Sequence, residues 1–281
     1  MPADLALVTD STAYLPQEAV DRHGIAVVPL SVVVGDEVLT EGVEVSPKDV
    51  AEALRARRRV TTSRPNPETF AAAYRAAAEA GAEGVVSVHL SAELSGTCEA
   101  ARLAAAESEI PVRVVDSRMV GMALGYAVLA AAEARATGQG LDQVAAAAER
   151  RAGRSHGFFY VDTLEHLRRG GRIGTARALL GSALAVKPLL HLSGGRIEPL
   201  EKVRTASRAI ARLEELVVEQ AGEGEVDVTV HHLAAEDRAE PLAERLRERV
   251  PGLRELYVGE VGAVIGAHVG PGLLAVVLAP R

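Results

Sequence analysis

Short apolar runs alternate with longer, Ala-rich segments of helical period through the first half of the chain. The apolar runs lie at residues 5–8, 25–34, 84–88 and 112–115, and the helical segments lie at residues 16–23, 50–58, 67–81, 95–107 and 120–136. Strands that alternate with helices are typical of parallel βαβ units. Residues 1–153 are therefore predicted to form an N-terminal α/β domain with a mainly parallel sheet.

The alternation ends at two consecutive Ala-rich helices that finish near Arg151. Beyond them lie strand-like runs at residues 158–161, 186–192, 197–203, 226–232, 253–258 and 273–278, with helices at residues 206–219 and after Pro241. The sequence SGGR at residues 193–196 predicts a β-hairpin between two of these runs. A chain of 281 residues also exceeds the ~250 at which one core usually stops growing. We therefore expect residues 154–281 to form a second α/β domain.

Composition argues against several classes of function. Aromatic residues make up 3% of the chain, Trp is absent and the formal net charge is −7, which disfavours stacking on bases and attraction to phosphates. We expect no nucleic-acid partner. Every Ala-rich segment is interrupted by Arg or Glu, so no run reaches the ~18 apolar residues of a membrane span. No leader pattern precedes the first strand, and we expect a cytoplasmic protein.

The sequence also disfavours metal and thiol chemistry. Cys98 is the one cysteine, and a small buried helix residue is the better interpretation than a nucleophile. His231 and His232 are neighbours on a predicted strand, so their side chains point to opposite faces and cannot chelate one metal together. Neither an HExxH motif nor a His/Cys ligand spacing is present, and no metal site is expected.

Three hydroxyl-rich segments follow predicted strands or open predicted helices. They are TDST at residues 9–12, TTSRP at residues 61–65 and SAELSGT at residues 91–97. The carboxyl ends of parallel strands line one edge of a sheet, where hydroxyls and helix N-termini suit an anion such as a carboxylate. Ser11, Ser63, Gly96 and Thr97 would support such a pocket, with Gly96 admitting the ligand close to the backbone. Each Ser or Thr could instead be a helix N-cap, and both interpretations stay open.

His268 is the one titratable residue in the Gly-rich, apolar stretch at residues 262–272. A His there can donate to a buried carboxylate, and its charge would offset the cost of desolvating the acid. A hydrogen bond to a nearby backbone carbonyl explains the local sequence equally well. Basic residues gather elsewhere, at positions 168, 169, 172, 177, 187, 196, 202 and 204. Most suit a solvated surface, but Arg172 follows a Gly-Gly turn and could face a phosphate or an acidic partner.

Eight motifs, taken together and in this order, resemble the DegV family. They are TDSTAYLP (9–16), TTSRPNP (61–67), LSGT (94–97), VVDS (114–117), RRGGRIG (168–174), KPLL (187–190), EKVRT (201–205) and IGAHVGPG (265–272). The resemblance implies two α/β domains with one fatty acid bound between them. By the same resemblance, Thr62, Ser95 and His268 would bind the fatty-acid carboxylate.

Some members of this family serve as the B subunit of a two-component fatty acid kinase. The resemblance thus implies a lipid carrier rather than an enzyme, with no cofactor of its own. It would present the carboxylate of a long-chain fatty acid to a separate kinase catalytic subunit. Arg172 and Arg204 would contact that kinase, although internal ion pairs, for example with Glu201, compete with this assignment.

Two other functions stay open from the sequence. One is a serine-dependent lipid hydrolase that uses Ser95 or Ser11 with His268. Such an enzyme needs a base beside the serine and an acid that orients the base, and no nucleophile elbow is expected. The other is a structural or regulatory protein that holds its lipid tightly.

Overall fold

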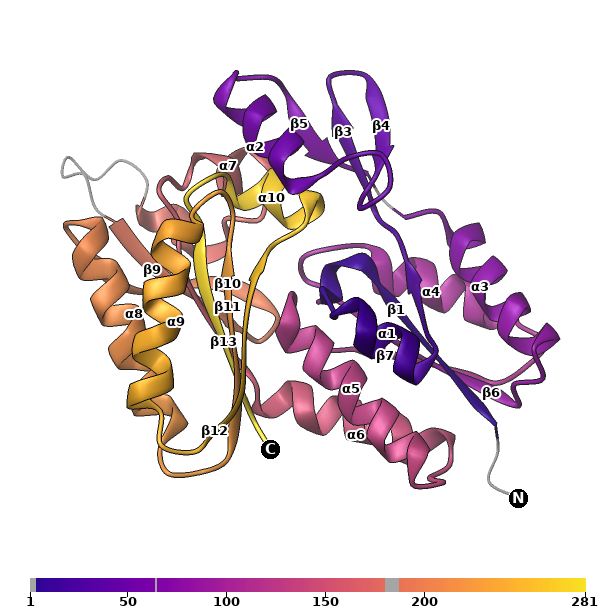
Figure 1. The fold of residues 1–281 in the computed structure, drawn as a ribbon. Helices are drawn as coiled ribbons and strands as arrows, with labels where there is room; N and C mark the ends of the chain where they lie inside the picture. The colour runs from indigo at the N-terminus through magenta and orange to yellow at the C-terminus, as the bar shows by residue number, and fades with distance from the viewer. Residues whose placement is uncertain (1–3, 64, 180–186) are drawn as a thin grey trace. The chain divides into compact units, whose positions relative to one another are not determined.

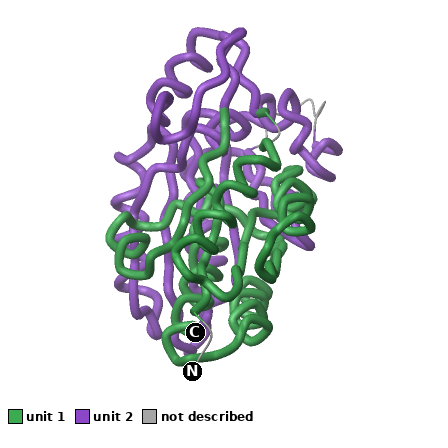
Figure 2. Tube along the Cα trace, turned by 90° about the vertical axis from the view of Figure 1, so that its right-hand side faces the viewer, with its two compact units in different colours: residues 1–31, 63–154 green, residues 32–62, 155–281 purple. Residues whose placement is uncertain are grey.

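A computed structural model of the chain describes residues 4–63, 65–179 and 187–281, and it contains two compact units (Figure 2). Unit 1 comprises residues 1–31 and 63–154, and unit 2 comprises residues 32–62 and 155–281. The predicted division at residue 153 therefore differs from the units in one segment, because residues 32–62 group with the C-terminal half. Among the described residues, every helix is too short or too polar to cross a membrane.

Unit 1 is built on a four-stranded parallel sheet. Its strands, in spatial order, are β2 (Ile25–Val28), β1 (Leu5–Asp10), β6 (Gly84–His89) and β7 (Val112–Asp116). The register aligns Thr9 with Val88 and His89 with Asp116, so the carboxyl ends of β1, β6 and β7 lie next to one another. The predicted mainly parallel α/β fold of the N-terminal half is confirmed.

Helices cover both faces of this sheet (Figure 1). They are α1 (Gln17–His23), α3 (Pro67–Glu79), α4 (Thr97–Ala106), α5 (Met122–Ala136) and α6 (Leu141–Arg154), with a short 3-10 turn η1 (Ser11–Ala13) after β1. Phe70 and Tyr74 of α3 pack with Val8 and the small residues of α4 in one buried cluster. Phe70 and Tyr74 are the largest side chains of this cluster, whose other buried members are Val and Ala.

Unit 2 contains a six-stranded mixed sheet. Its strands, in spatial order, are β10 (Arg196–Val203), β9 (Lys187–Ser193), β8 (His156–Tyr160), β13 (Leu274–Pro280), β11 (Val226–His232) and β12 (Leu253–Glu260). The predicted hairpin is present as the antiparallel pair β9–β10, and Val186, its expected first residue, lies outside the described residues. Among the described strand pairs of this sheet, β11–β12 is parallel and the others are antiparallel.

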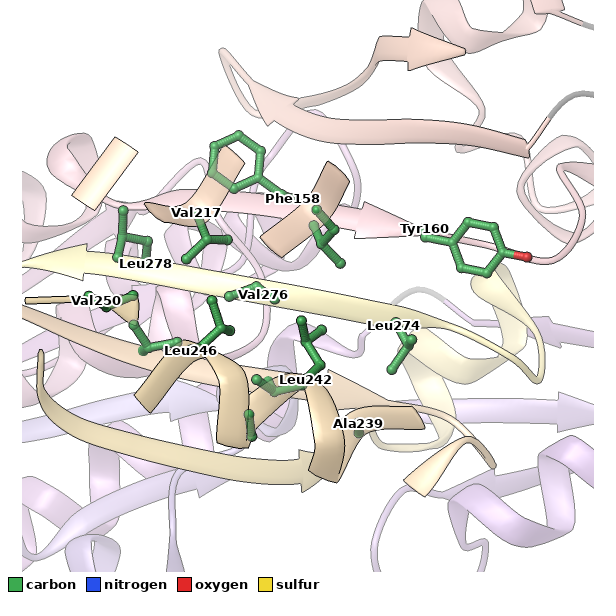
Figure 3. Close-up of a cluster of buried hydrophobic side chains, with 14 of the residues drawn as sticks. Phe158, Tyr160, Val217, Ala239, Leu242, Leu246, Val250, Leu274, Val276 and Leu278 are labelled. Atoms are coloured by element: carbon green, nitrogen blue, oxygen red, sulfur yellow. The ribbon is translucent and has the colours of Figure 1, made fainter. Parts of the chain in front are cut away.

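The core of unit 2 lies between this sheet and two long helices, α8 (Ala206–Ala221) and α9 (Glu236–Arg249). Figure 3 shows its aliphatic residues, with Leu274, Val276 and Leu278 of β13 beside Leu242 and Leu246 of α9. Helix α9 begins at Glu236, earlier than expected, and contains Pro241 within it. Two acidic residues in the first turn favour this earlier start.

Residues 32–62 add a small layer to unit 2. They contain all but the first residue of β3 (Ser31–Val34), and the whole of β4 (Glu37–Thr40), α2 (Pro47–Arg55) and β5 (Val60–Thr62). The three strands form a sheet of order β4-β3-β5. Helix α2 packs against α10 (Ala263–Val269), which is why this segment groups with the C-terminal half. The predicted cap of α2 is present, with Ser46 accepting from the Asp49 N–H and Asp49 accepting from the Ser46 N–H.

The prediction of one strand over residues 25–34 is wrong in its extent. The run at residues 25–34 forms two strands in different sheets, β2 and β3. Pro29 lies at the break and has no N–H to donate, so a continuous ladder cannot pass through it. Leu30 is held at the break by its N–H, which donates to Ser11 Oγ at 3.0 Å.

Candidate functional site

Thr62 and His268, which lie 206 residues apart in sequence, are hydrogen-bonded in unit 2. The Thr62 Oγ1 and His268 Nε2 atoms are 2.9 Å apart. Thr62 is the last residue of β5 and pairs with Val32 of β3, while His268 lies in the last turn of α10. Two of the three predicted carboxylate-binding side chains are thus in direct contact.

Helix α10 places His268, and a buried carboxylate holds the start of this helix. Glu41, which is 6% exposed, accepts a hydrogen bond of 2.8 Å from the Val264 N–H. A carboxylate on a first-turn N–H stabilises a helix end. The helix ends at Gly270, whose φ of +74° is open to glycine but costly for other residues. The sequence did not single out Glu41, because a lone acid in a surface-like segment gives no sign of burial.

His268 is neutral around pH 7. Burial, followed by the positive charge of Arg172, lowers the pKa of His268 to about 4. The Nδ1 atom is buried and has no hydrogen-bond partner among the residues that the structure describes. The imidazole therefore offers the Thr62 hydroxyl a neutral partner.

The two arginines of the predicted kinase contact differ in their surroundings. Arg172 is half-buried, and its Nη1 donates to the Gly170 carbonyl oxygen at 2.6 Å. Arg204 is exposed just after β10 and makes no ion pair within the described ranges of the chain. Glu201, the expected internal partner, is bound by Arg212 at 3.0 Å instead.

Ser95 lies in unit 1, in the turn between β6 and α4. The Ser91 carbonyl oxygen accepts from the Leu94 N–H at 3.0 Å and the Ser95 N–H at 3.1 Å, which closes the turn. Ser95 Oγ lies 2.8 Å from Thr97 Oγ1 and accepts from the Thr97 N–H at 3.3 Å. Ser95 is half-buried, Thr97 is buried and Gly96 is exposed. The hydroxyl thus contacts the first residue of α4, but the N-cap of this helix is Gly96, so Ser95 is not the helix N-cap of the alternative interpretation.

The two other supporting residues hold the backbone. Ser11 accepts from the Leu30 N–H, and the exposed Ser63 donates its N–H to the Ser31 carbonyl oxygen at 3.3 Å. Thr61 and Thr62 lie on β5 in the three-stranded sheet of unit 2, not at the edge of the parallel sheet as predicted. Sequence reasoning missed this because the partner of β5 is β3, which a local pattern does not identify.

A buried polar network that the sequence did not reveal lies behind the Ser95 turn. His89 Nδ1 lies 3.0 Å from Asp10 Oδ2, and His89 Nε2 lies 2.6 Å from Ser87 Oγ, which accepts from the Tyr74 hydroxyl at 2.8 Å. Ser87, His89 and Asp10 have the connectivity of a Ser-His-Asp triad. Asp10, Ser87 and His89 are each 0% exposed, so no substrate can reach Ser87 in this structure. The Asp10 carboxylate also accepts from the Leu90 N–H at 3.0 Å and thereby holds the start of the turn.

The nucleophile-elbow spacing GxSxG does occur, as GRSHG at residues 153–157, against expectation. This segment runs from the end of α6 into β8, which is the reverse of the strand-to-helix turn that exposes a nucleophile. Ser155 is 3% exposed. No group of three or more potential metal ligands is present among the described residues.

The structure thus defines a class: an α/β protein of two units, one with a parallel sheet and a hydroxyl turn after β6, the other with a half-buried Thr–His pair. Residues 4–281 match the family described as "Uncharacterised protein, DegV family". A DegV domain-containing protein of Streptomyces coelicolor is 64% identical over 281 residues, covering 100% of both chains. The Protein DegV of Bacillus subtilis is 37% identical over 279 residues and covers 97% of this chain and 98% of its own. The chain belongs to the DegV family.

Solved structures agree with this assignment. One is described as "Fatty Acid Binding of a DegV family Protein from Thermus thermophilus", and it has a TM-score of 0.93 at 37% identity, covering 99% of this chain and 100% of its own. Another is described as "DegV, a fatty acid binding protein from Bacillus subtilis", with a TM-score of 0.90 at 35% identity and the same coverage. The predicted α/β fold and the family resemblance are both confirmed.

Proposed function

We propose that this chain binds one long-chain fatty acid and holds its carboxylate with Thr62, Ser95 and His268. The observation that carries the proposal is the 2.9 Å contact between Thr62 and His268. It joins two of the three residues that the family resemblance selects, in a chain whose structural relatives are described as fatty acid binding.

The chemistry of the ligand explains why such a site is needed. Burying an acyl chain is favourable by roughly 0.8 kcal/mol per CH₂ group. A carboxylate carried with it loses its water, and this cost is large unless donors replace the water. The Thr62 hydroxyl is half-buried and already oriented by a neighbour, so it supplies a donor without a charge. A neutral imidazole adds no ammonium-like group that would itself need solvation.

We further propose that the bound acid is the substrate of a separate kinase. Phosphorylation of a carboxylate gives an acyl phosphate, which hydrolyses when water reaches it. A protein that covers the acyl chain and leaves the head group to a partner solves the problems of solubility and hydrolysis together. The exposed Arg204 and the half-buried Arg172 provide positive charge for that encounter in a chain of net charge −7.

Thr62→Val removes the hydroxyl while keeping the branched shape, and Thr61→Val is the matched control. Thr61 is the preceding residue of β5, also half-buried, so its side chain points to the other face of the sheet. We expect denaturing extraction of the wild-type protein to yield about one fatty acid per chain. Thr62→Val should bind added fatty acid roughly tenfold more weakly, and Thr61→Val nearly as tightly as wild type.

Two outcomes would contradict the proposal. A purified protein that contains no fatty acid and takes up none on addition is not a carrier. Equal losses of affinity in the two threonine variants would place the carboxylate elsewhere. The extraction also tests the alternatives: one fatty acid per chain supports a carrier or a structural role and argues against a hydrolase, which would instead release acid from an added acyl ester.

A further inference from the structure

Gly170 lies directly against the imidazole of His268. A Cβ atom added at Gly170 would lie 2.1 Å from His268 Nδ1 and 2.9 Å from Cε1. The backbone of Gly170 has φ −73° and ψ −9°, an ordinary helical conformation that any residue adopts. Glycine is therefore not required by the backbone here. The imidazole is what excludes a side chain.

The contact is reciprocal between two short helices of unit 2. Gly170 follows α7 (Glu165–Arg169), and Gly270 follows α10. A Cβ at Gly270 would lie 2.2 Å from Cδ2 of His166, a residue of α7. Each helix thus ends in a glycine that accommodates a histidine of the other, and this packing fixes both rings at close range.

The two nitrogens of His268 have different surroundings. Nε2 faces the Thr62 hydroxyl, and the buried Nδ1 faces Gly170, with no hydrogen-bond partner among the described residues. A neutral imidazole carries one N–H. An N–H buried without an acceptor costs about as much as a lost hydrogen bond, so the proton is more stable on Nε2. Thr62 Oγ1 then accepts from Nε2, and its own proton is left to donate elsewhere.

We propose that Gly170 is a positioning residue that fixes the ring of His268 so that Nε2–H donates to Thr62 and the Thr62 hydroxyl donates to the ligand carboxylate. This inference rests on the proposed function for the identity of the ligand. His268 then contributes to carboxylate binding through Thr62 and not by direct contact with the ligand. The low pKa of His268, caused by burial and by Arg172, agrees with a neutral ring that has one proton to place.

The same glycine also contacts Arg172. Its carbonyl oxygen accepts from Arg172 Nη1 at 2.6 Å, while its Cα side faces His268. The residue therefore sets the position of the imidazole and of the nearby positive charge together. A side chain at position 170 would have to displace the ring, because the carbonyl on the other side is already engaged.

The test is Gly170→Ala, with Gly153→Ala as the control. A Cβ at Gly153 meets no atom within 4 Å, so this variant adds the same methyl group without a collision. We expect Gly170→Ala to fold, as judged by circular dichroism, and to bind a long-chain fatty acid roughly tenfold more weakly. Gly153→Ala should match the wild type. In a His268→Ala background the Gly170→Ala change should add little further loss, since the obstructing ring is gone.

A second measurement does not depend on the variant folding or on the ligand. Imidazole ¹⁵N shifts of the wild-type protein report which nitrogen of His268 is protonated, and we expect the proton on Nε2. A proton on Nδ1, or losses from Gly170→Ala and His268→Ala that simply add, would overturn the inference. If the wild-type protein binds no fatty acid, the proposed function fails. The positioning role is then still decided by two measurements: the tautomer of His268 from the ¹⁵N shifts, and the coupling between positions 170 and 268 from the unfolding free energies of the variants.

Discussion

Asp10→Asn would exchange one carboxylate oxygen of the buried network in unit 1 for an amide NH₂ group, which donates hydrogen bonds and cannot accept them. In the native structure Oδ1 accepts from the N–H and hydroxyl of Thr12, at 3.1 and 2.5 Å. Oδ2 accepts from the Leu90 N–H at 3.0 Å and lies 3.0 Å from His89 Nδ1. Whichever way the Asn side chain is oriented, its amide nitrogen faces a backbone N–H.

The size of the effect follows from these contacts. One buried N–H without an acceptor costs about 1–3 kcal/mol, and hydrogen bonds to a charged group contribute about 1.5–3 kcal/mol each. Asp10 is 0% exposed, so water cannot replace the lost bonds. We expect Asp10→Asn to lower the free energy of unfolding by about 3–5 kcal/mol, as breaking a buried charged network usually does. That is a large part of the ~5–15 kcal/mol typical of a domain.

Urea unfolding followed by circular dichroism measures this loss, and Asp21→Asn is the control. Asp21 is exposed and accepts from Gln17 Nε2 at 2.8 Å, so its replacement should change stability by no more than about 0.5 kcal/mol. Hydrogen exchange at Leu90 should also accelerate in Asp10→Asn. A loss below about 1 kcal/mol, or equal losses in the two variants, would refute the argument that Asp10 holds the ends of β1 and β6.

Two further predictions follow from charged and titrating groups. Arg204→Ala should leave fatty-acid affinity nearly unchanged while phosphorylation of the bound acid by a partner kinase falls sharply. Arg172→Ala should do the same, and loss of lipid binding in either variant would place that arginine at the head group. Burial lowers the pKa of His231 to about 4, from 6.5 in an unfolded chain. Between pH 6.5 and 4 the unfolded state binds a proton at His231 that the folded state does not. The free energy of unfolding, measured by urea titration, should therefore be highest above pH 6.5 and fall by roughly 3 kcal/mol towards pH 4. The fall should be smaller in His231→Gln.

Local patterns predicted the elements that depend on neighbours in sequence. The capping box at Ser46 and Asp49 and the β9–β10 hairpin were both foreseen, because caps and tight turns are set by residues a few positions apart. The pairing of β3 with β5 was not foreseen, since strand partners are chosen by packing against the rest of the fold. The contacts of α2 and β5 with α10 then group residues 32–62, and Thr62 with them, with unit 2.

The candidate site divides in the same way. The resemblance to a family selected Thr62 and His268, but nothing in the local sequence indicated that their side chains would meet 206 residues apart. Gly170 lies in the RRGGRIG motif (168–174), yet its role depends on a contact with α10 that only the structure shows. Local sequence reports which residue types are present, whereas distances of this kind arise from tertiary packing.

The neutrality of His268 bears on how a carrier could serve a kinase. In the proposed phosphoryl transfer, the carboxylate attacks a phosphoryl group, so its oxygen has to keep its negative charge while it is held. An imidazolium would form an ion pair with it and would draw charge from that oxygen. Burial and Arg172 lower the pKa of His268 to about 4, which favours a neutral ring, and a neutral ring can orient Thr62 without neutralising the acid. A neutral donor therefore binds the head group less tightly than a cation would, and burial of the acyl chain can supply the missing affinity. In return, the carboxylate keeps its charge and its reactivity.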